Sequence, residues 1–239
     1  MERMYGFCKI ALAGLAALGL WSASLLPARA GDGAKPAFSV EPVLEFAALS
    51  LAEGYTVSVQ WYGRMDEDQT DRLRELLQSG FRLDESAGPA VTHISPKEGS
   101  LLQGTWSRLS DGYEGESFLR LEAGGAEAGA LAAAGSRIDG WLRETGAAGD
   151  WSVKAAGVWK GDAAMQPEEA VKGLARTLLG AEELESYKDR GIVNALYRTS
   201  RIGLKAEGTE AALQTALHRN TETGAWNLAV GAPMLTGEF

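Results

Sequence analysis

The chain has 239 residues, 45% of them hydrophobic, and a formal net charge of −9. This composition is typical of a globular protein with a sizeable core, while the acidic excess repels nucleic acid and anionic lipid at long range. Cys8 is the only cysteine. A chain that loses its N-terminal segment therefore has no disulfide, no thiolate nucleophile and no thiolate metal ligand.

Residues 1–30 have the pattern of an export signal. Arg3 and Lys9 give a basic start, residues 10–26 form an uncharged run rich in Ala, Leu and Gly, and the segment ends in Ala-Arg-Ala. A small-x-small ending is the site that signal peptidase cuts. The apolar run is short for a membrane anchor, which needs about 20 residues, so cleavage is favoured over retention. We expect a mature chain that begins at Gly31, works outside the cytoplasm and has no membrane span.

Removal of residues 1–30, which hold three basic residues and one acidic residue, leaves 20 basic and 31 acidic residues and a net charge of −11. The remaining sequence divides into a lead-in with a first helix (31–54), an N-terminal half (55–147) and a C-terminal half (148–239). Asp66 and Gln69 form a capping-box pattern at the start of one helix. The predicted elements are a helix over 42–51, a strand over 55–62, a helix over 66–80, a loop over 86–99, strands over 102–109 and 117–122, a helix over 126–145, a strand over 151–160, a helix over 167–179, and strands over 211–219 and 225–230.

The two halves open with a similar pattern. At an offset of 98 residues, Trp61-Tyr62-Gly63 aligns with Trp159-Lys160-Gly161, and the apolar faces of the two following helices match. A duplicated β-α-β-β unit and a chance recurrence of strand and helix patterns both explain this. The strands alternate and are joined by hairpin turns, which favours antiparallel sheets with helices packed on one face over a doubly wound parallel sheet. The predicted fold class is therefore α+β with two related halves.

Motifs for catalysis, nucleotide binding or metal binding are missing from the sequence. The two histidines, His93 in the predicted loop and His218 on a polar strand face, are expected to be surface residues. The acidic run from Asp66 resembles a calcium loop, but Asp71 and Leu77 stand where that loop needs Gly and Glu. We predict no catalytic residue, no metal site and no cofactor.

One segment opposes the overall charge. Five cations lie between residues 188 and 205, with Tyr197 among them and Tyr187 directly before them. This segment either binds an anionic glycan or a carboxylate, or is a solvated strand face. Convergence of Arg198 and Arg201 on one anion requires a bend near residues 199–200. The candidate binding residues are Arg190, Tyr197, Arg198, Arg201 and Lys205.

Tryptophan is frequent in the predicted strands. Core packing is the expected role of such side chains, and a sugar-stacking platform is the alternative. The tryptophans concerned are Trp61, Trp106, Trp151, Trp159 and Trp226.

The C-terminal stretch 231–239 (GAPMLTGEF) resembles the G-T-P-[IV]-[IL]-T-x-E-Y tail of the YwmB-like family, with Ala232 in place of Thr and Phe239 in place of Tyr. The resemblance implies an exported protein of a spore-forming Gram-positive bacterium with a two-part α+β fold related to the TATA-box-binding protein. The family has no defined catalytic residues to carry over. DNA binding is rejected, because this chain is acidic, carries an export signal and lacks a basic strand face with paired phenylalanines.

The combined expectation is a non-enzymatic binding or structural module at the cell envelope, linked to wall or sporulation processes. Its expected partner is an envelope protein or wall material and not nucleic acid; the oligomeric state is left open. The alternative is an envelope hydrolase, or a regulator of one, that uses unidentified carboxylates. A deep pocket with two carboxylates about 5 to 10 Å apart would favour the hydrolase, and a broad open surface would favour the module.

Overall fold

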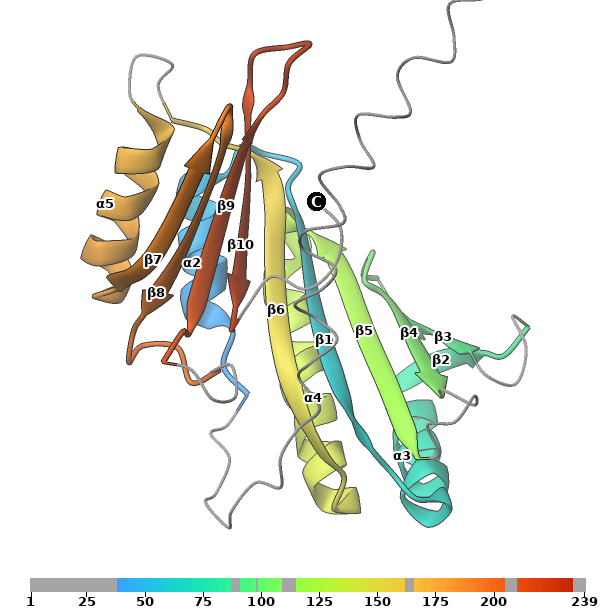
Figure 1. The fold of residues 1–239 in the computed structure, drawn as a ribbon. Coiled ribbons are helices and arrows are strands. Elements are labelled where there is room, and N and C mark those ends of the chain that lie inside the picture. Colours follow the sequence, from blue (N-terminus) through green and yellow to red (C-terminus); the bar gives the residue numbers. More distant parts are fainter. Residues whose placement is uncertain are drawn as a thin grey trace, which may run out of the picture. The chain divides into compact units, whose positions relative to one another are not determined.

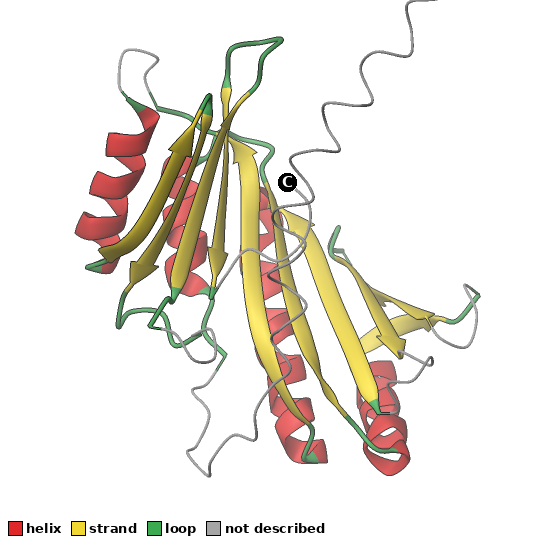
Figure 2. Cartoon of the chain, viewed as in Figure 1, coloured by secondary structure: helices red, strands yellow, loops and turns green. Residues whose placement is uncertain are grey.

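The computed structural model describes residues 38–86, 91–97, 99–108, 115–161, 166–204 and 210–233. The predicted export signal and its cleavage site, residue Lys205, and the tail 234–239 that carries most of the YwmB-like pattern lie outside these residues. The described part is an α+β fold, as predicted, in which one antiparallel sheet is packed against helices (Figures 1 and 2). No helix in the described ranges is long and apolar enough to cross a membrane.

The described elements follow one another in two similar series. The helices are α2 (Glu41–Ser50), α3 (Glu67–Gly80), α4 (Ala128–Thr145) and α5 (Pro167–Leu179), with a 3-10 turn at Gly125–Glu127. The strands are β1 (Thr56–Arg64), β2 (Phe81–Asp84), β3 (Val91–Pro96), β4 (Gln103–Arg108), β5 (Glu116–Gly124), β6 (Ala148–Val158), β7 (Glu182–Asp189), β8 (Ile192–Arg198), β9 (Leu213–Arg219) and β10 (Trp226–Ala232).

The strand order shows that the halves are related. The ten strands lie in the order β2-β3-β4-β5-β1-β6-β10-β9-β8-β7, and β1 pairs with β6 at the centre. Outward from this pair, the first half runs β1-β5-β4-β3-β2 and the second half runs β6-β10-β9-β8-β7. Each half thus places its strands in the same sequence, and the predicted relationship between halves is confirmed. The repeated unit is longer than the predicted β-α-β-β, because each half has four strands after its helix.

The predicted loop over 86–99 is wrong in part, since β3 (Val91–Pro96) lies within it. This strand is short, and its proline made it resemble a loop. Pro96 is tolerated because it is the last residue of the strand and pairs only with Phe81 of the short edge strand β2. His93, which was expected in a loop, therefore lies on a strand.

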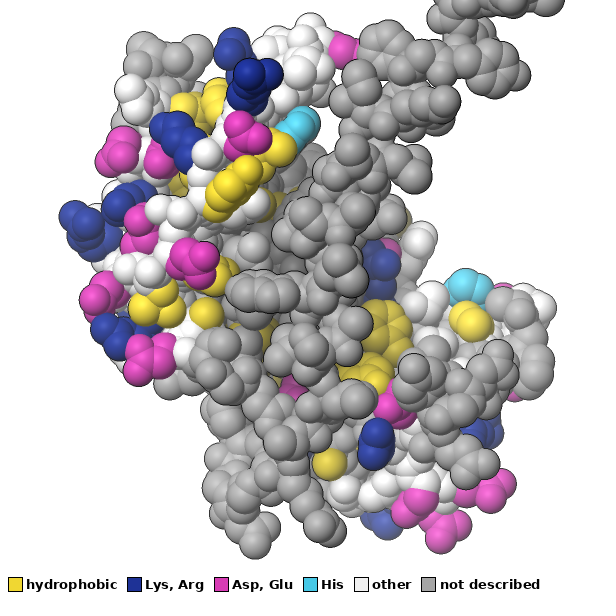
Figure 3. Space-filling model, viewed as in Figure 1, with side chains coloured by type: hydrophobic (Ala, Val, Ile, Leu, Met, Phe, Trp, Pro, Cys, Tyr) yellow, Lys and Arg dark blue, Asp and Glu magenta, His cyan; other side chains and the backbone are white. Residues whose placement is uncertain are grey.

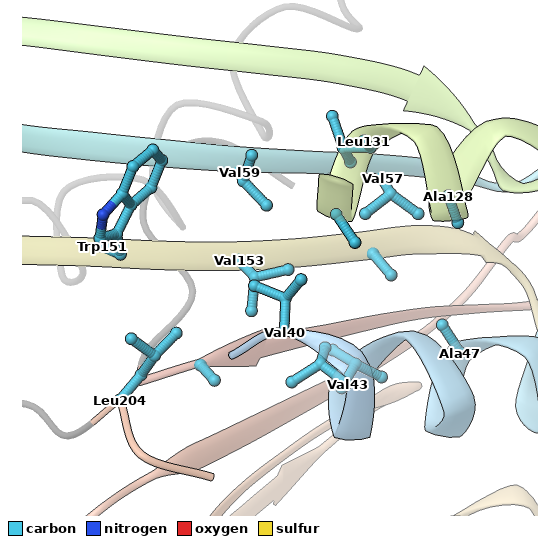
Figure 4. Close-up of a cluster of buried hydrophobic side chains, with 14 of the residues drawn as sticks. Val40, Val43, Ala47, Val57, Val59, Ala128, Leu131, Trp151, Val153 and Leu204 are labelled. Atoms are coloured by element: carbon cyan, nitrogen blue, oxygen red, sulfur yellow. The ribbon is translucent and has the colours of Figure 1, made fainter. Parts of the chain in front are cut away.

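The helix that precedes each half packs against the other half. Helix α2 precedes β1 but contacts β6, β10 and α5, and helix α4 precedes β6 but contacts β1, β5 and α3. Figure 4 shows Val43 of α2 and Leu131 of α4 close to the valines of the central strands β1 and β6. The buried side chains form one continuous hydrophobic cluster across both halves. The two halves therefore share a core.

The helix ends follow the predicted local signals. The Asp66 carboxylate accepts a hydrogen bond from the Gln69 backbone N–H at 2.8 Å, and the Gln69 side chain accepts one from the Asp66 N–H at 3.0 Å. This is the predicted capping box. Helix α4 ends at Gly146, whose φ of 75° is open to glycine without strain.

All the described helices lie on one face of the sheet (Figures 1 and 2). Side chains alternate between the two faces along each strand, so half of the strand residues point away from the helices. The tryptophans predicted to lie on strands belong to the helix-facing set: Trp61, Trp106 and Trp151 are buried, and Trp226 of β10 and Trp159, which follows β6, pack against the core. The predicted core role of these tryptophans is confirmed.

Candidate functional site: the open face of the sheet

The sheet face that carries no described helix is called the open face here. Its central part is formed by the three middle strands, β5, β1 and β6. In the parts of this face visible in Figure 3, cationic and anionic side chains are interspersed with hydrophobic ones. The open-face residues of these strands are Ser58, Gln60 and Tyr62 on β1, Phe118, Arg120 and Glu122 on β5, and Asp150, Ser152 and Lys154 on β6.

The strand pairing arranges these side chains in rows across the sheet. Arg120 lies opposite Gln60, while Lys154 lies opposite Ser58. The two cations lie on either side of β1 and are offset by two residues along it, so their Cα atoms are about 12 Å apart at ~4.8 Å per strand and ~3.4 Å per residue. Glu122 lies directly across Ser58 from Lys154. Ser58 is only 7% exposed. The set Ser58, Gln60, Tyr62, Phe118, Arg120 and Lys154 is called the central cluster below.

The two cations of the central cluster influence each other. Burial lowers the pKa of Lys154 below its ordinary value of 10.5, and the nearby charge of Arg120 lowers it further. Arg120 forms an ion pair with Glu122 on its own strand. The Nε atom of Arg120 is buried and, in the described part of the chain, has no hydrogen-bond partner. The guanidinium therefore keeps a donor that is not used within the fold.

An aromatic pair adjoins the cations. Tyr62 of β1 lies directly opposite Phe118 of β5, and both belong to the open face. The Tyr62 side chain is 41% exposed. The sugar-stacking alternative assigned such a role to tryptophans, but the strand tryptophans of the described residues face the helices instead. The sequence shows the alternation of β1 and β5 but not their pairing, so it does not reveal that Tyr62 and Phe118 are neighbours.

The structure spreads the predicted basic segment along the outer strands instead of gathering it. Arg190 lies in the turn between β7 and β8, where its backbone N–H donates to the Asp189 carboxylate at 2.7 Å. Arg198 is at the other end of β8, roughly 20 Å away at ~3.4 Å per residue. It forms ion pairs with Glu182, at 2.7 Å, and with Glu210.

The bend required for convergence is present, but it directs Arg201 elsewhere. Strand β8 ends at Arg198, and the Thr199 hydroxyl accepts a hydrogen bond from the Arg201 N–H at 3.1 Å. The Arg201 guanidinium then donates to the Leu178 carbonyl of α5 at 3.0 Å. Arg198 and Arg201 thus bond to different layers of the fold.

Tyr197 is 2% exposed and faces the helix layer, where burial is the main cause that raises the pKa of its phenol. Lys205 lies outside the described residues. Of the five candidate binding residues, Arg190, Arg198 and Arg201 are therefore the ones that a partner can reach in the described structure. Their binding role stays a prediction.

The two histidines are far apart. His93 of β3 and His218 of β9 are both exposed on the open face, in different halves. Six strand spacings separate them in the sheet order, roughly 29 Å at ~4.8 Å per strand. No group of three potential metal-ligating side chains occurs within the described residues.

Two hollows bear on the hydrolase alternative. One, of about 10 Å³, lies between α5 and the strands β7 to β9 and has room for about one water molecule. The other, of about 540 Å³, is an open depression where α3 meets the end of α4. The salt bridge between Arg72 and Glu144, at 2.9 Å, links the two helices there. Neither of these hollows encloses a substrate-sized space.

No family model matches the sequence, and no curated protein matches it significantly. Three solved structures show partial similarity. The regulatory subunit of aspartate kinase from Thermus thermophilus is 11% identical, with 75% of this chain and 87% of that chain covered and a TM-score of 0.19. The immunity protein TplEi from Pseudomonas aeruginosa is 10% identical, with 79% and 88% covered and a TM-score of 0.23. DynU16, a protein of the dynemicin biosynthetic locus, is 12% identical, with 73% and 86% covered and a TM-score of 0.22. These values are too low to carry an argument about function.

Proposed function

We propose that this protein is an exported binding module of the cell envelope and that the open face of its sheet is the contact surface. The observation that carries the proposal is the one-sided placement of the described helices: among the residues that the structure describes, no helix lies over the centre of the other face of the ten-stranded sheet. The side chains there are polar, aromatic and charged with both signs, and side chains of these types recognise ligands by hydrogen bonds, charge and stacking.

The export signal and the YwmB-like resemblance support the envelope as the place of action. The signal limits the partners to those outside the cytoplasm, and the net charge of −11 argues against nucleic acid. An envelope protein or wall material remains as the partner. The larger hollow described above is lined by the carboxylates Asp68, Asp71, Glu75 and Glu144, but it is an open depression and not the deep pocket that the hydrolase alternative requires. Export itself is tested by N-terminal sequencing of the envelope fraction, which should give a chain that begins at Gly31.

Co-sedimentation of the mature chain with isolated envelope material tests the proposal. The open-face variant Arg120→Gln/Lys154→Gln should lose most of its binding. The matched control is Arg137→Gln/Arg176→Gln, which removes the same charge from exposed positions on α4 and α5 and should bind as the wild type does.

A third variant, Arg190→Gln/Arg198→Gln/Arg201→Gln, separates the open face from the basic segment. Loss of binding in this variant with retention in the open-face variant would assign contact to the basic segment and contradict the proposal. The reverse pattern supports the open face.

A further inference from the structure

The central cluster places two kinds of recognition chemistry side by side. Tyr62 and Phe118 form one row, and Gln60 and Arg120 form the next open-face row along the same two strands. The rows are about 7 Å apart, because open-face positions recur every second residue at ~3.4 Å each. An aromatic platform and a cationic, hydrogen-bonding site thus lie within the span of one sugar ring and its carboxylate.

The cations favour an anion between them. Arg120 and Lys154 lie diagonally across β1 and repel each other, and burial already disfavours the charge on the lysine. A carboxylate placed over Ser58 and Gln60 would reduce the repulsion and accept charge-assisted hydrogen bonds from both cations. The Nε of Arg120 has no hydrogen-bond partner within the described structure but is buried, so the exposed part of the guanidinium would donate to the ligand. Glu122 competes for Arg120, since it already pairs with that guanidinium.

The position in the sheet favours a saccharide over a peptide. Peptides commonly bind sheets by adding a strand at an edge, where backbone groups are free. Strands β1, β5 and β6 each have a paired neighbour on both sides, so their backbone groups are used within the sheet. A ligand at this place must be recognised by side chains alone. The hydroxyl group of Ser152 and the amide group of Gln60 suit sugar hydroxyls, and the exposed ring of Tyr62 suits the apolar face of a sugar.

We propose that the central cluster binds a carboxylate-bearing saccharide, with the carboxylate between Arg120 and Lys154 and the sugar ring against Tyr62 and Phe118. This inference rests on the proposed binding role of the open face and names its ligand class.

Isothermal titration of the mature chain with tetragalacturonate tests the inference, with its methyl ester as the neutral probe and tetraglutamate as the acidic peptide probe. The wild type should bind tetragalacturonate at least about tenfold more tightly than either of the others.

Arg120→Gln/Lys154→Gln and Tyr62→Ala should each weaken binding of tetragalacturonate about tenfold, and Arg137→Gln/Arg176→Gln should leave it unchanged. Glu122→Gln should tighten binding, because it removes the competing carboxylate. Thermal unfolding of every variant shows whether the fold is retained.

Equal binding of tetraglutamate, or full binding by Tyr62→Ala, would reduce the site to a general anion site and overturn the inference. Absence of tetragalacturonate binding overturns it as well. The envelope co-sedimentation is independent of this result. If the open-face variant still loses envelope binding while the saccharide does not bind, the proposed function stands and the ligand class is wrong. If neither assay responds to the open-face variant, both proposals are contradicted.

Discussion

Tyr62 and Phe118 stand directly opposite each other at the centre of the sheet, on the face that has no described helix. Their strand neighbours Trp61 and Leu119 are also paired, but on the helix face, where they are 2% and 0% exposed. The same two strands thus supply a buried apolar pair to the core and an aromatic pair to the open face. This division lets side chains of the open face be changed with little effect on the core.

The first prediction concerns Tyr62. Tyr62→Ala should weaken binding to envelope material about tenfold, or about 1.4 kcal/mol, because stacking area is lost. The free energy of unfolding should change little, since the side chain is 41% exposed. Tyr187→Ala is the control, because Tyr187 is 58% exposed on the edge strand β7. Comparable weakening by both substitutions would mean that the aromatic pair has no special role.

Because of Lys154, an increase in pH should raise the stability of the fold and weaken the binding of a carboxylate. The folded-state pKa of this lysine is below 10.5, so the protonated lysine disfavours the folded state. The free energy of unfolding should therefore rise as the pH increases from the folded-state pKa towards 10.5, while binding of a carboxylate falls. Lys154→Met should remove both pH effects and should not lower the melting temperature. A lower melting temperature in Lys154→Met would contradict the direction of the pKa shift.

Helices α2 and α4 each pack against the other half, so the two halves should unfold together. Phe46 of α2 is 0% exposed, and its helix covers the half that follows much later in the chain. Phe46→Ala should cost about 3 to 5 kcal/mol and accelerate hydrogen exchange in β6 and β10. Leu49→Ala on the same helix is the control, because Leu49 is 50% exposed. Two separate unfolding transitions in urea would show that the halves are independent.

Position 80 has no room for a side chain, because the ring of Trp141 on helix α4 packs against it. A Cβ at this position would lie 2.6 Å from Cη2 of Trp141. Gly80→Ala should destabilise the fold by about 1 to 3 kcal/mol, and Trp141→Leu in the same chain should reduce that cost. Gly140→Ala is the control, since a Cβ there meets nothing within 4 Å; helix propensity should make it stabilising by about 1 kcal/mol. Urea unfolding of Gly80→Ala, Trp141→Leu, the double variant and Gly140→Ala measures both the clash and its coupling.

Features that depend on neighbouring residues were predictable from the sequence. The capping box at Asp66, the glycine end of α4 and the helix over 167–179 each rest on signals a few residues apart. The tryptophans were predictable as core residues because alternation assigns each of them to one strand face. The relationship between the two halves could also be predicted, since their patterns recur at a regular offset.

Features that depend on pairing between distant strands were not predictable. The sequence does not show that α2 and α4 each pack against the other half, because each helix would have the same apolar stripe whichever half it covered. Likewise, Arg120 and Lys154 are far apart in the sequence and meet only across β1. The basic segment drew attention because its charges are close in the sequence, yet Arg190 and Arg198 lie at opposite ends of β8.

Hydroxyl-radical footprinting of the mature chain, free and bound to envelope material, tests the binding role of the open face most directly. Oxidation of Tyr62 and Phe118 should fall by at least about half on binding, while Leu49 and Leu101, which are 50% and 82% exposed, should be oxidised as before. Protection confined to the helices or to the segment 188–204, with Tyr62 and Phe118 unchanged, would contradict the account.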